Sequence, residues 1–244
     1  MPLGRVAASY AVPATMAARA VGRARATHGA RDPVRDRRVE QGEATRAALV
    51  RAAQRLFTRK GYGATATEEI VRAAKVTRGA LYHHFSDKEE LFRAVFEATE
   101  AEMLERVLGV AADVPTPLAQ LQVAIDAFLD ACLDPTLRRI ILQEGPAVLG
   151  WTTWHEIDSQ YAFGAVSAGL QLAMDSGELD RQPVEPLAHL VVGSIMQAGM
   201  VVARAEDQKA ESAAMGRALH RLLDGLRPAA ARGRAAGSRR RGAR

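Results

Sequence analysis

The chain has 244 residues, of which 48% are apolar and 5% aromatic, and it carries a formal net charge of +5. This length accommodates one large or two small domains, and the composition fits a soluble helical protein rich in alanine and leucine. Cys132 is the single cysteine, which excludes an intrachain disulfide and a metal cluster held by several thiolates. We expect Cys132 to pack in the core rather than to act as a redox sensor.

The charge is distributed unevenly along the chain. Residues 1–42 carry a net charge of +5, residues 43–93 one of +4 and residues 228–244 one of +6, whereas residues 94–227 carry −10. A basic N-terminal region followed by an acidic body suits a protein that presents one part of its surface to an anionic polymer such as DNA.

Residues 1–42 are rich in alanine and arginine and lack helical periodicity, so we expect a disordered basic extension. Three explanations of this segment are open. It is an arm that adds phosphate contacts, an organelle transit peptide, or an upstream addition to a protein whose translation starts later, for example at Met16. We favour an unstructured, dispensable extension, with the DNA-contacting arm second.

The first predicted helix spans residues 43–60, because apolar residues recur there at helical spacing. Gly61 and Gly63 are expected to end it, with Tyr62 packed between them. Arg46, near its start, belongs either to a solvated basic face or to a contact with the DNA backbone. The apolar face comprises Ala48, Leu49, Ala52, Ala53, Leu56 and Phe57.

Two short helical patterns joined by a tight break come next, followed by the start of a longer helix. Thr65 with Glu68, and Ser86 with Glu89, have the spacing of capping boxes. Two short helices joined by a tight turn are the geometry of a helix–turn–helix, whose second helix fits the major groove of DNA. We place this motif at about residues 66–85.

The second helix of the motif is expected from Thr77 to about His84. Thr77 is placed to cap its N-terminus, and Leu81 and Phe85 are expected to face inward. The side chains between them are then available to DNA.

Residues 44–96 resemble the tetracycline-repressor (TetR) family of transcriptional regulators. The resemblance rests on the apolar first helix, the turn Lys60-Gly61-Tyr62-Gly63, the pair Glu69-Ile70, the run Val76-Thr77-Arg78-Gly79-Ala80-Leu81-Tyr82-His83-His84-Phe85 and the run Lys88-Glu89-Glu90-Leu91. Lys75 stands where the family usually places a turn glycine. If Lys75 adopts the left-handed conformation, the cost is about 1 kcal/mol relative to glycine.

The resemblance implies an all-α fold with an N-terminal three-helix DNA-binding domain and a larger helical domain for ligand binding and dimerisation. We expect the DNA-binding domain at residues 43–103 and the larger domain at residues 104–227. Residues 228–244 are expected to be a disordered basic tail, which either contacts DNA without sequence preference or merely keeps the chain soluble.

Several side chains of the motif have the chemistry that DNA recognition requires. Arg78 can bind guanine O6 and N7 in bidentate fashion, and the small Gly79 and Ala80 allow close approach to base edges. Hydroxyls and cations at helix starts are placed to contact phosphates. The candidate DNA contacts are Arg46, Thr65, Thr77, Arg78, Gly79, Ala80, Tyr82, His83 and Lys88.

The remaining chain predicts further helices. Their expected spans are residues 87–110, 118–133, 135–142, 148–155, 161–174, 184–204 and 208–226, with a break at Gly145-Pro146 and an end at Gly177. The apolar run from Leu187 to Ala203 contains His189 and Gln197, so we interpret it as a buried helix rather than a membrane span.

No catalytic constellation, cofactor motif or metal site stands out, so we do not expect an enzyme. His155-Glu156 does not start a zincin motif, because Ser159 occupies the place of the second histidine. A small-molecule pocket is more plausible, since it needs apolar walls with a few polar groups. The candidate lining residues, each of which is otherwise plain core, are Phe128, Cys132, Leu142, Trp151, Trp154, His155, Tyr161 and Gln197.

These features together predict a cytoplasmic regulator that binds double-stranded DNA. The resemblance implies a ligand-responsive repressor that binds a near-palindromic operator as a homodimer, paired through residues 184–204 and 208–226 and controlled by a small-molecule effector. Repression rather than activation is expected only because it is usual in the family that the chain resembles. The alternative is a constitutive architectural DNA-binding protein that uses its basic tails.

Overall fold

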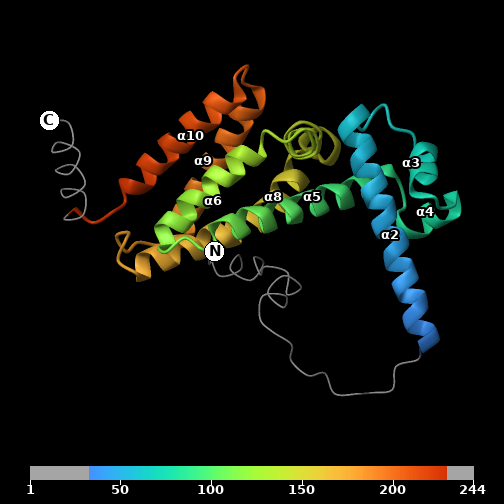
Figure 1. Ribbon diagram of the computed structural model, residues 1–244, viewed down its shortest axis with the longest axis horizontal. Coiled ribbons are helices and arrows are strands. Elements are labelled where there is room, and N and C mark those ends of the chain that lie inside the picture. Colours follow the sequence, from blue (N-terminus) through green and yellow to red (C-terminus); the bar gives the residue numbers. More distant parts are fainter. Residues whose placement is uncertain (1–32, 230–244) are drawn as a thin grey trace, which may run out of the picture. The chain divides into compact units, whose positions relative to one another are not determined.

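The computed structural model describes residues 33–229, and this part of the chain is helical without a strand (Figure 1). The all-α prediction is therefore confirmed. The helices are α2 (Pro33–Lys60), α3 (Thr67–Ala74), α4 (Arg78–His84), α5 (Lys88–Ala111), α6 (Pro117–Ala131), α7 (Pro135–Leu137), the π-helix η1 (Arg138–Glu144), α8 (Gly145–Asp175), α9 (Val184–Arg204) and α10 (Gln208–Asp224).

The chain forms two compact units. The first unit combines the residues up to Glu100 with Arg139–Ile157, and the second combines Ala101–Arg138 with the residues from Asp158 onward. The helices α5 and α8 each begin in the first unit and end in the second. The first unit is thus assembled from two separate stretches of sequence, whereas the predicted domains were each continuous.

An aromatic cluster forms the core of the first unit. Phe57 of α2 and Phe92 of α5 are fully buried, with ring centroids 5.5 Å apart. Tyr62 packs on both rings, at 5.6 and 5.3 Å. Leu81 and Phe85 are also buried, as predicted. Each fully buried apolar side chain of this size stabilises the fold by about 1.5–3 kcal/mol.

The first helix starts ten residues earlier than predicted. α2 begins at Pro33, so residues 33–42 of the expected disordered extension are helical. Proline at the first helical position costs no hydrogen bond, because that N–H would have no partner within the helix. The rest of the predicted extension, and the tail beyond residue 229, lie outside the described residues.

The two predicted capping boxes are wrong in detail. The Thr65 hydroxyl donates to the Gly61 carbonyl at 2.7 Å, and the N-cap of α3 is Ala66. At the start of α5, Asp87 Oδ1 accepts the Glu90 N–H at 2.7 Å, and Glu90 Oε2 accepts the Ser86 N–H at 2.6 Å. The capping pair is therefore Asp87 with Glu90, one residue later than predicted, and Glu90 reaches back to Ser86 rather than to Asp87.

The expected break at Gly145-Pro146 is also wrong. The π-helix η1 runs directly into α8, and the non-helical residue is Gly150, with φ 74° and ψ 155°. The indole Nε1 of Trp154 donates to the Ile141 carbonyl at 2.9 Å across this segment, which satisfies the fully buried indole. Gly145 is required here, because a Cβ would lie 2.7 Å from the Trp154 ring and 2.8 Å from the Phe96 ring.

Three helices, α6, α9 and α10, pack side by side in the second unit (Figure 1). Glycines allow their close approach: a Cβ on Gly199 would lie 3.0 Å from the Phe128 ring, and one on Gly216 would lie 2.5 Å from Asp126 Oδ1. By length and composition alone α9 is long and apolar enough to cross a membrane. One face of α9, which includes Ala188, Val192 and Ile195, is buried, and the helix packs against α6 and α10 as in a helical bundle.

Candidate nucleic-acid interface

The helix α4 has one buried and one exposed face. Leu81 and Phe85 anchor it in the first unit. Most of the predicted DNA contacts on it and on its N-cap face outward. The exposed residues are Thr77, Arg78, Gly79, Tyr82 and His83, and Ala80 is half-buried. The local sequence therefore folds into an anchored helix that presents a polar, partly aromatic face to solvent.

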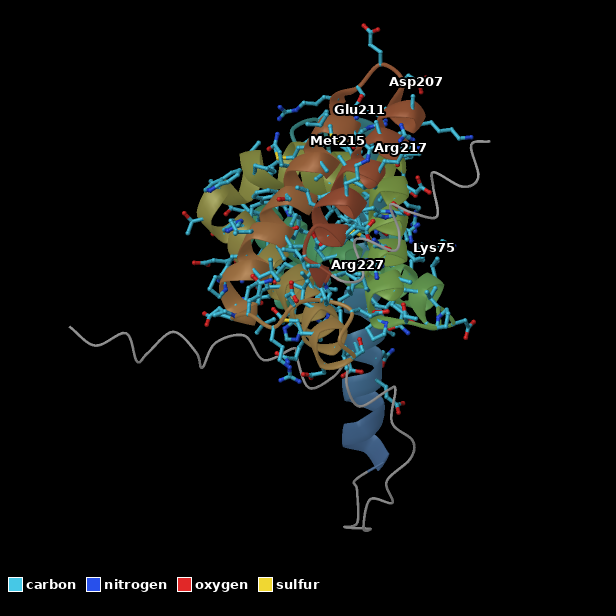
Figure 2. All side chains as sticks on the ribbon, turned by 90° about the vertical axis from the view of Figure 1, so that its left-hand side faces the viewer. Lys75, Asp207, Glu211, Met215, Arg217 and Arg227 are labelled. Carbon is cyan, nitrogen blue, oxygen red and sulfur yellow. The ribbon has the colours of Figure 1, made fainter. Side chains whose placement is uncertain are left out.

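The turn before α4 is closed by Lys75. This residue adopts the left-handed conformation (φ 57°, ψ 41°), in which the family usually has a glycine. Lysine therefore costs about 1 kcal/mol relative to glycine at this position. The N–H groups of Lys75 and Val76 donate to the carbonyls of Arg72 and Val71, which satisfies the C-terminal end of α3. The exposed Lys75 side chain (labelled in Figure 2) adds a positive charge close to the start of α4.

Thr77 caps α4 as predicted. Its hydroxyl oxygen accepts the Ala80 N–H at 3.1 Å. Because a hydroxyl has one proton and two lone pairs, this capping bond leaves the proton of Thr77 available to a phosphate oxygen. The same side chain can therefore hold the helix start and contact a DNA backbone.

Arg78 lies between two partners in this structure. Its Nη1 is 3.6 Å from Glu68 Oε1, and its guanidinium carbon is 5.6 Å from the centroid of the Tyr82 ring. The pKa of Glu68 is lowered, first by its own backbone N–H and further by the Thr67 hydroxyl and the charge of Arg78. An ion pair this exposed contributes little, so Arg78 can leave Glu68 when a guanine edge is offered.

Two more predicted contacts lie on aromatic rings. Lys88 Nζ is 4.2 Å from the centroid of the Tyr62 ring, and the guanidinium carbon of Arg46 is 5.1 Å from that of Phe85. Burial lowers the pKa of Lys88, and the charge of Glu144 opposes this shift. Arg46 is exposed and Lys88 is half-buried. Both cations are therefore held close to the buried core of the first unit while remaining at its surface.

Thr65 does not belong to this surface. It is 1% exposed, and its hydroxyl donates to the carbonyl of Gly61. A phosphate cannot reach a side chain buried in this way, so the predicted backbone contact of Thr65 is corrected to a structural role. It ties the end of α2 to the start of α3.

Sequence reasoning missed Glu144, which contacts the turn after α2. Glu144 Oε2 accepts the Tyr62 N–H at 2.8 Å, and Glu144 Oε1 lies 3.3 Å from Arg139 Nε. Glu144 and Tyr62 are 82 residues apart, so no local pattern signals this contact.

The second unit contains an apolar cavity of about 360 Å³. Two of the predicted pocket residues, Phe128 and Tyr161, line it. Four helices supply the wall, namely α5, α6, α8 and α9. Other lining residues, which the sequence did not single out, are Met103, Val107, Leu121, Ile125, Asp158, Val166, Val192 and Ile195. Their helical spacing could have identified them as inward-facing, but not as cavity-lining.

Six predicted pocket residues lie elsewhere. Four of them, Leu142, Trp151, Trp154 and His155, belong to the first unit. Trp154 is fully buried, whereas Trp151 is 60% exposed and its ring is parallel to that of His155 at 6.0 Å. This corrects the expected pocket, because none of these four side chains lines the cavity.

The remaining two predicted pocket residues, Cys132 and Gln197, are in the second unit but do not line the cavity. Cys132 is fully buried, and its Sγ would lie 3.2 Å from a Cβ on Gly199, so it packs in the core. Gln197 is exposed on α9, in a separate hollow that includes Met200 and Arg204. Within residues 33–229, no three histidine, cysteine or acidic side chains come together as metal ligands.

Two family models match the chain. One, described as "Bacterial regulatory proteins, tetR family", matches residues 49–95. The other, "Tetracyclin repressor-like, C-terminal domain", matches residues 118–226. The first match contains α3, α4 and most of the exposed face described above, and the second contains α7 to α10 and all of α6 except Pro117.

Similar proteins come from several bacteria. A TetR-family transcriptional regulator from Pectobacterium atrosepticum has a crystal structure with a TM-score of 0.69 and 32% identity, covering 77% of this chain and 96% of that one. The Transposon Tn10 TetC protein of Escherichia coli is 29% identical over 64% of this chain and 79% of its own length. The HTH-type transcriptional regulator AcrR of Shigella flexneri is 34% identical over 43% of this chain, and the match spans 49% of that regulator.

Proposed function

Because the chain belongs to the TetR family of transcriptional regulators, which bind DNA and are not enzymes, we propose that it is a ligand-responsive repressor binding a near-palindromic operator as a homodimer. The observation that carries the DNA-binding part is the exposed face of α4 above the buried Leu81 and Phe85. A helix anchored in this way can enter a major groove without losing its own packing.

The residues of the face have distinct proposed roles. Arg78 would bind a guanine edge, and Gly79 with Ala80 would let the backbone approach the bases. Thr77 and Lys88 would contact phosphates, which fixes the register of the helix without reading sequence. The remaining proposed contacts, to phosphates or bases, are Arg46, Tyr82 and His83.

Exposed leucines on α9 and α10 support the proposed homodimer. Leu190 of α9 is 71% exposed and Leu222 of α10 is 63% exposed. Small exposed residues, Gly193 and Ser194, follow Leu190 by one helical turn, so a second copy could approach closely. Earlier in α10, Figure 2 labels Glu211, Met215 and Arg217, together with the N-cap residue Asp207. In a symmetric dimer the two α4 helices would read half-sites separated by about 34 Å or a multiple of it.

The path of α5 and α8 supports the response to a ligand. Both helices line the cavity in the second unit and also contribute to the first unit. A ligand that binds one arrangement of these helices more tightly than another would shift the population of DNA-binding dimers. We further propose that residues 43–103 and 104–227 act as the DNA-binding and the effector domain, and that the protein works in the bacterial cytoplasm.

Selection of DNA in vitro tests the proposal. The purified full-length protein would select from a library of genomic fragments at about 150 mM salt, because nonspecific binding weakens as salt rises. A recurring inverted repeat is the expected result. Enrichment without a shared motif would contradict a specific dimer.

The same selection separates the repressor from the alternative function. Deleting residues 1–32 and 230–244 leaves α2 to α10 intact. A specific regulator keeps its sequence preference after this deletion, whereas an architectural DNA-binding protein that relies on its basic ends loses most of its affinity.

A further inference from the structure

The cavity of the second unit has one formally charged side chain in a wall that is otherwise almost entirely apolar. Asp158 of α8 lines the cavity and is 3% exposed. Among the lining residues, all from the described part of the chain, it is the only one with a formal charge, and the other polar members are Gln120 and Tyr161. A carboxylate placed in such a wall determines which ligand charge the cavity accepts, because Coulomb energies are large where water is scarce.

Two aromatic rings line the same cavity. Tyr161 follows Asp158 by three residues on α8, so the two side chains project from neighbouring positions on one helix face. Phe128 lines the cavity from α6. A carboxylate together with aromatic rings is the set of groups that binds an organic cation, because the ring faces carry negative potential.

We propose that this cavity binds a compact apolar molecule with one protonated amine, and that Asp158 is its counter-ion. The volume of about 360 Å³ lies at the lower end of the roughly 300–1,000 Å³ of small-molecule sites. A ligand with a carboxylate should bind most weakly, because two like charges would share a site of low dielectric constant. The inference rests on the proposed function only in taking this cavity as the effector site.

Binding of three probes with one carbon skeleton tests the inference. The full-length protein would be titrated at pH 7 in a calorimeter with naphthylmethylamine, naphthalenemethanol and naphthoic acid. We expect the amine to bind at least about tenfold more tightly than the alcohol, and the acid to bind most weakly. If the acid binds as tightly as the amine, or if none of the three probes binds, the inference is wrong.

A pair of variants on α8 assigns the effect to Asp158. Asp158→Asn removes the charge with little change in volume, so the affinity for the amine should fall to that for the alcohol while the affinity for the alcohol stays the same. Asp175→Asn is the matched control, because Asp175 is exposed near the end of the same helix. An equal loss in both variants would show that only the overall charge of the protein matters. If Asp158→Asn does not fold, the ranking of the three probes on the natural protein decides.

Operator binding is measured separately, so that the two proposals can fail independently. If the amine binds through Asp158 and operator affinity is unchanged in its presence, the ligand class is right and the ligand-responsive part of the proposed function is wrong. If no operator is selected although the amine binds through Asp158, the inference stands and the proposed repressor function is contradicted.

Discussion

The Glu144 carboxylate at the end of η1 accepts the backbone N–H of Tyr62 at 2.8 Å. Tyr62 belongs to the turn that ends α2, and its ring lies 4.2 Å from Nζ of Lys88, a proposed phosphate contact. The second stretch of the first unit, Arg139–Ile157, therefore helps to hold that unit together. The hydrogen-bond donor is a backbone N–H group, so no side-chain pattern in the sequence predicts this contact.

Replacing Glu144 tests the contribution of this contact. Glu144→Ala should lower the free energy of unfolding by about 1.5–3 kcal/mol, because a hydrogen bond to a charged group is lost. Glu144→Gln keeps an acceptor oxygen and should recover part of the loss. Urea denaturation measures the change, with Glu156→Ala as the control, since Glu156 is exposed on α8 in the same unit. Equal stability of the Glu144→Ala and Glu156→Ala variants would argue against the contact.

The turn between α2 and α3 offers a matched pair of glycines. Gly61 has φ +89°, and a Cβ there would lie 2.7 Å from Glu144 Oε1 and 2.8 Å from Arg139 Nη2. Gly61→Ala should therefore destabilise the protein by about 1–3 kcal/mol. Gly63→Ala should change stability by less than about 0.5 kcal/mol, because nothing lies within 4 Å of the added Cβ. Thermal unfolding of both variants makes the comparison, and a larger effect at Gly63 would contradict it.

Arg78→Ala tests direct reading of a base. On the selected operator it should cost about 1–3 kcal/mol of binding free energy and relax the preference at one position of each half-site. Arg93→Ala on α5, which removes another exposed arginine, is the control. Fluorescence anisotropy with operator and scrambled duplexes measures the effect. An equal loss on both duplexes would show that Arg78 only touches phosphate.

Lys88→Ala tests a phosphate contact. Binding should weaken to a similar extent on every sequence, and the slope of log K against log salt should decrease in magnitude by about one. The salt dependence of anisotropy titrations gives the slope. A change in base preference, with the slope unaltered, would instead place Lys88 at a base edge.

The second capping box predicts a pH dependence of stability. The pKa of Glu90 is lowered from 4.5, first by the Ser86 N–H and then by the Ser86 side chain. Its folded pKa is below the unfolded value, so its contribution to stability is present above pH 4.5 and is lost as the pH falls through the lowered pKa. Glu90→Gln should therefore be less stable than the natural protein near pH 6, and the difference should vanish at lower pH.

Urea titrations between about pH 3 and pH 6 measure this difference. Glu89→Gln is the neighbouring control, because Glu89 lies in the same first turn of α5 and is exposed. A difference between the natural protein and Glu90→Gln that stays constant over this range would rule out the proposed role of ionised Glu90.

Local features of the sequence were sufficient to predict the helices and part of the surface. The α9 prediction agrees with the structure at both ends, because apolar periodicity and flanking residues mark the ends of a helix. The cap at Thr77 and the buried positions of Leu81 and Phe85 follow from the same short-range rules. These are properties of residues one or two helical turns apart.

Only the tertiary structure decided the features that depend on distant residues. The sequence predicted Thr65 as a helix cap that contacts a phosphate, but the structure buries its side chain against the end of α2. The sequence predicted Trp154 as a pocket residue, but the structure buries it in the core of the first unit. Asp158, four residues later, lines the cavity of the second unit. Sequence periodicity shows that a side chain faces inward, but packing between helices determines what it meets there.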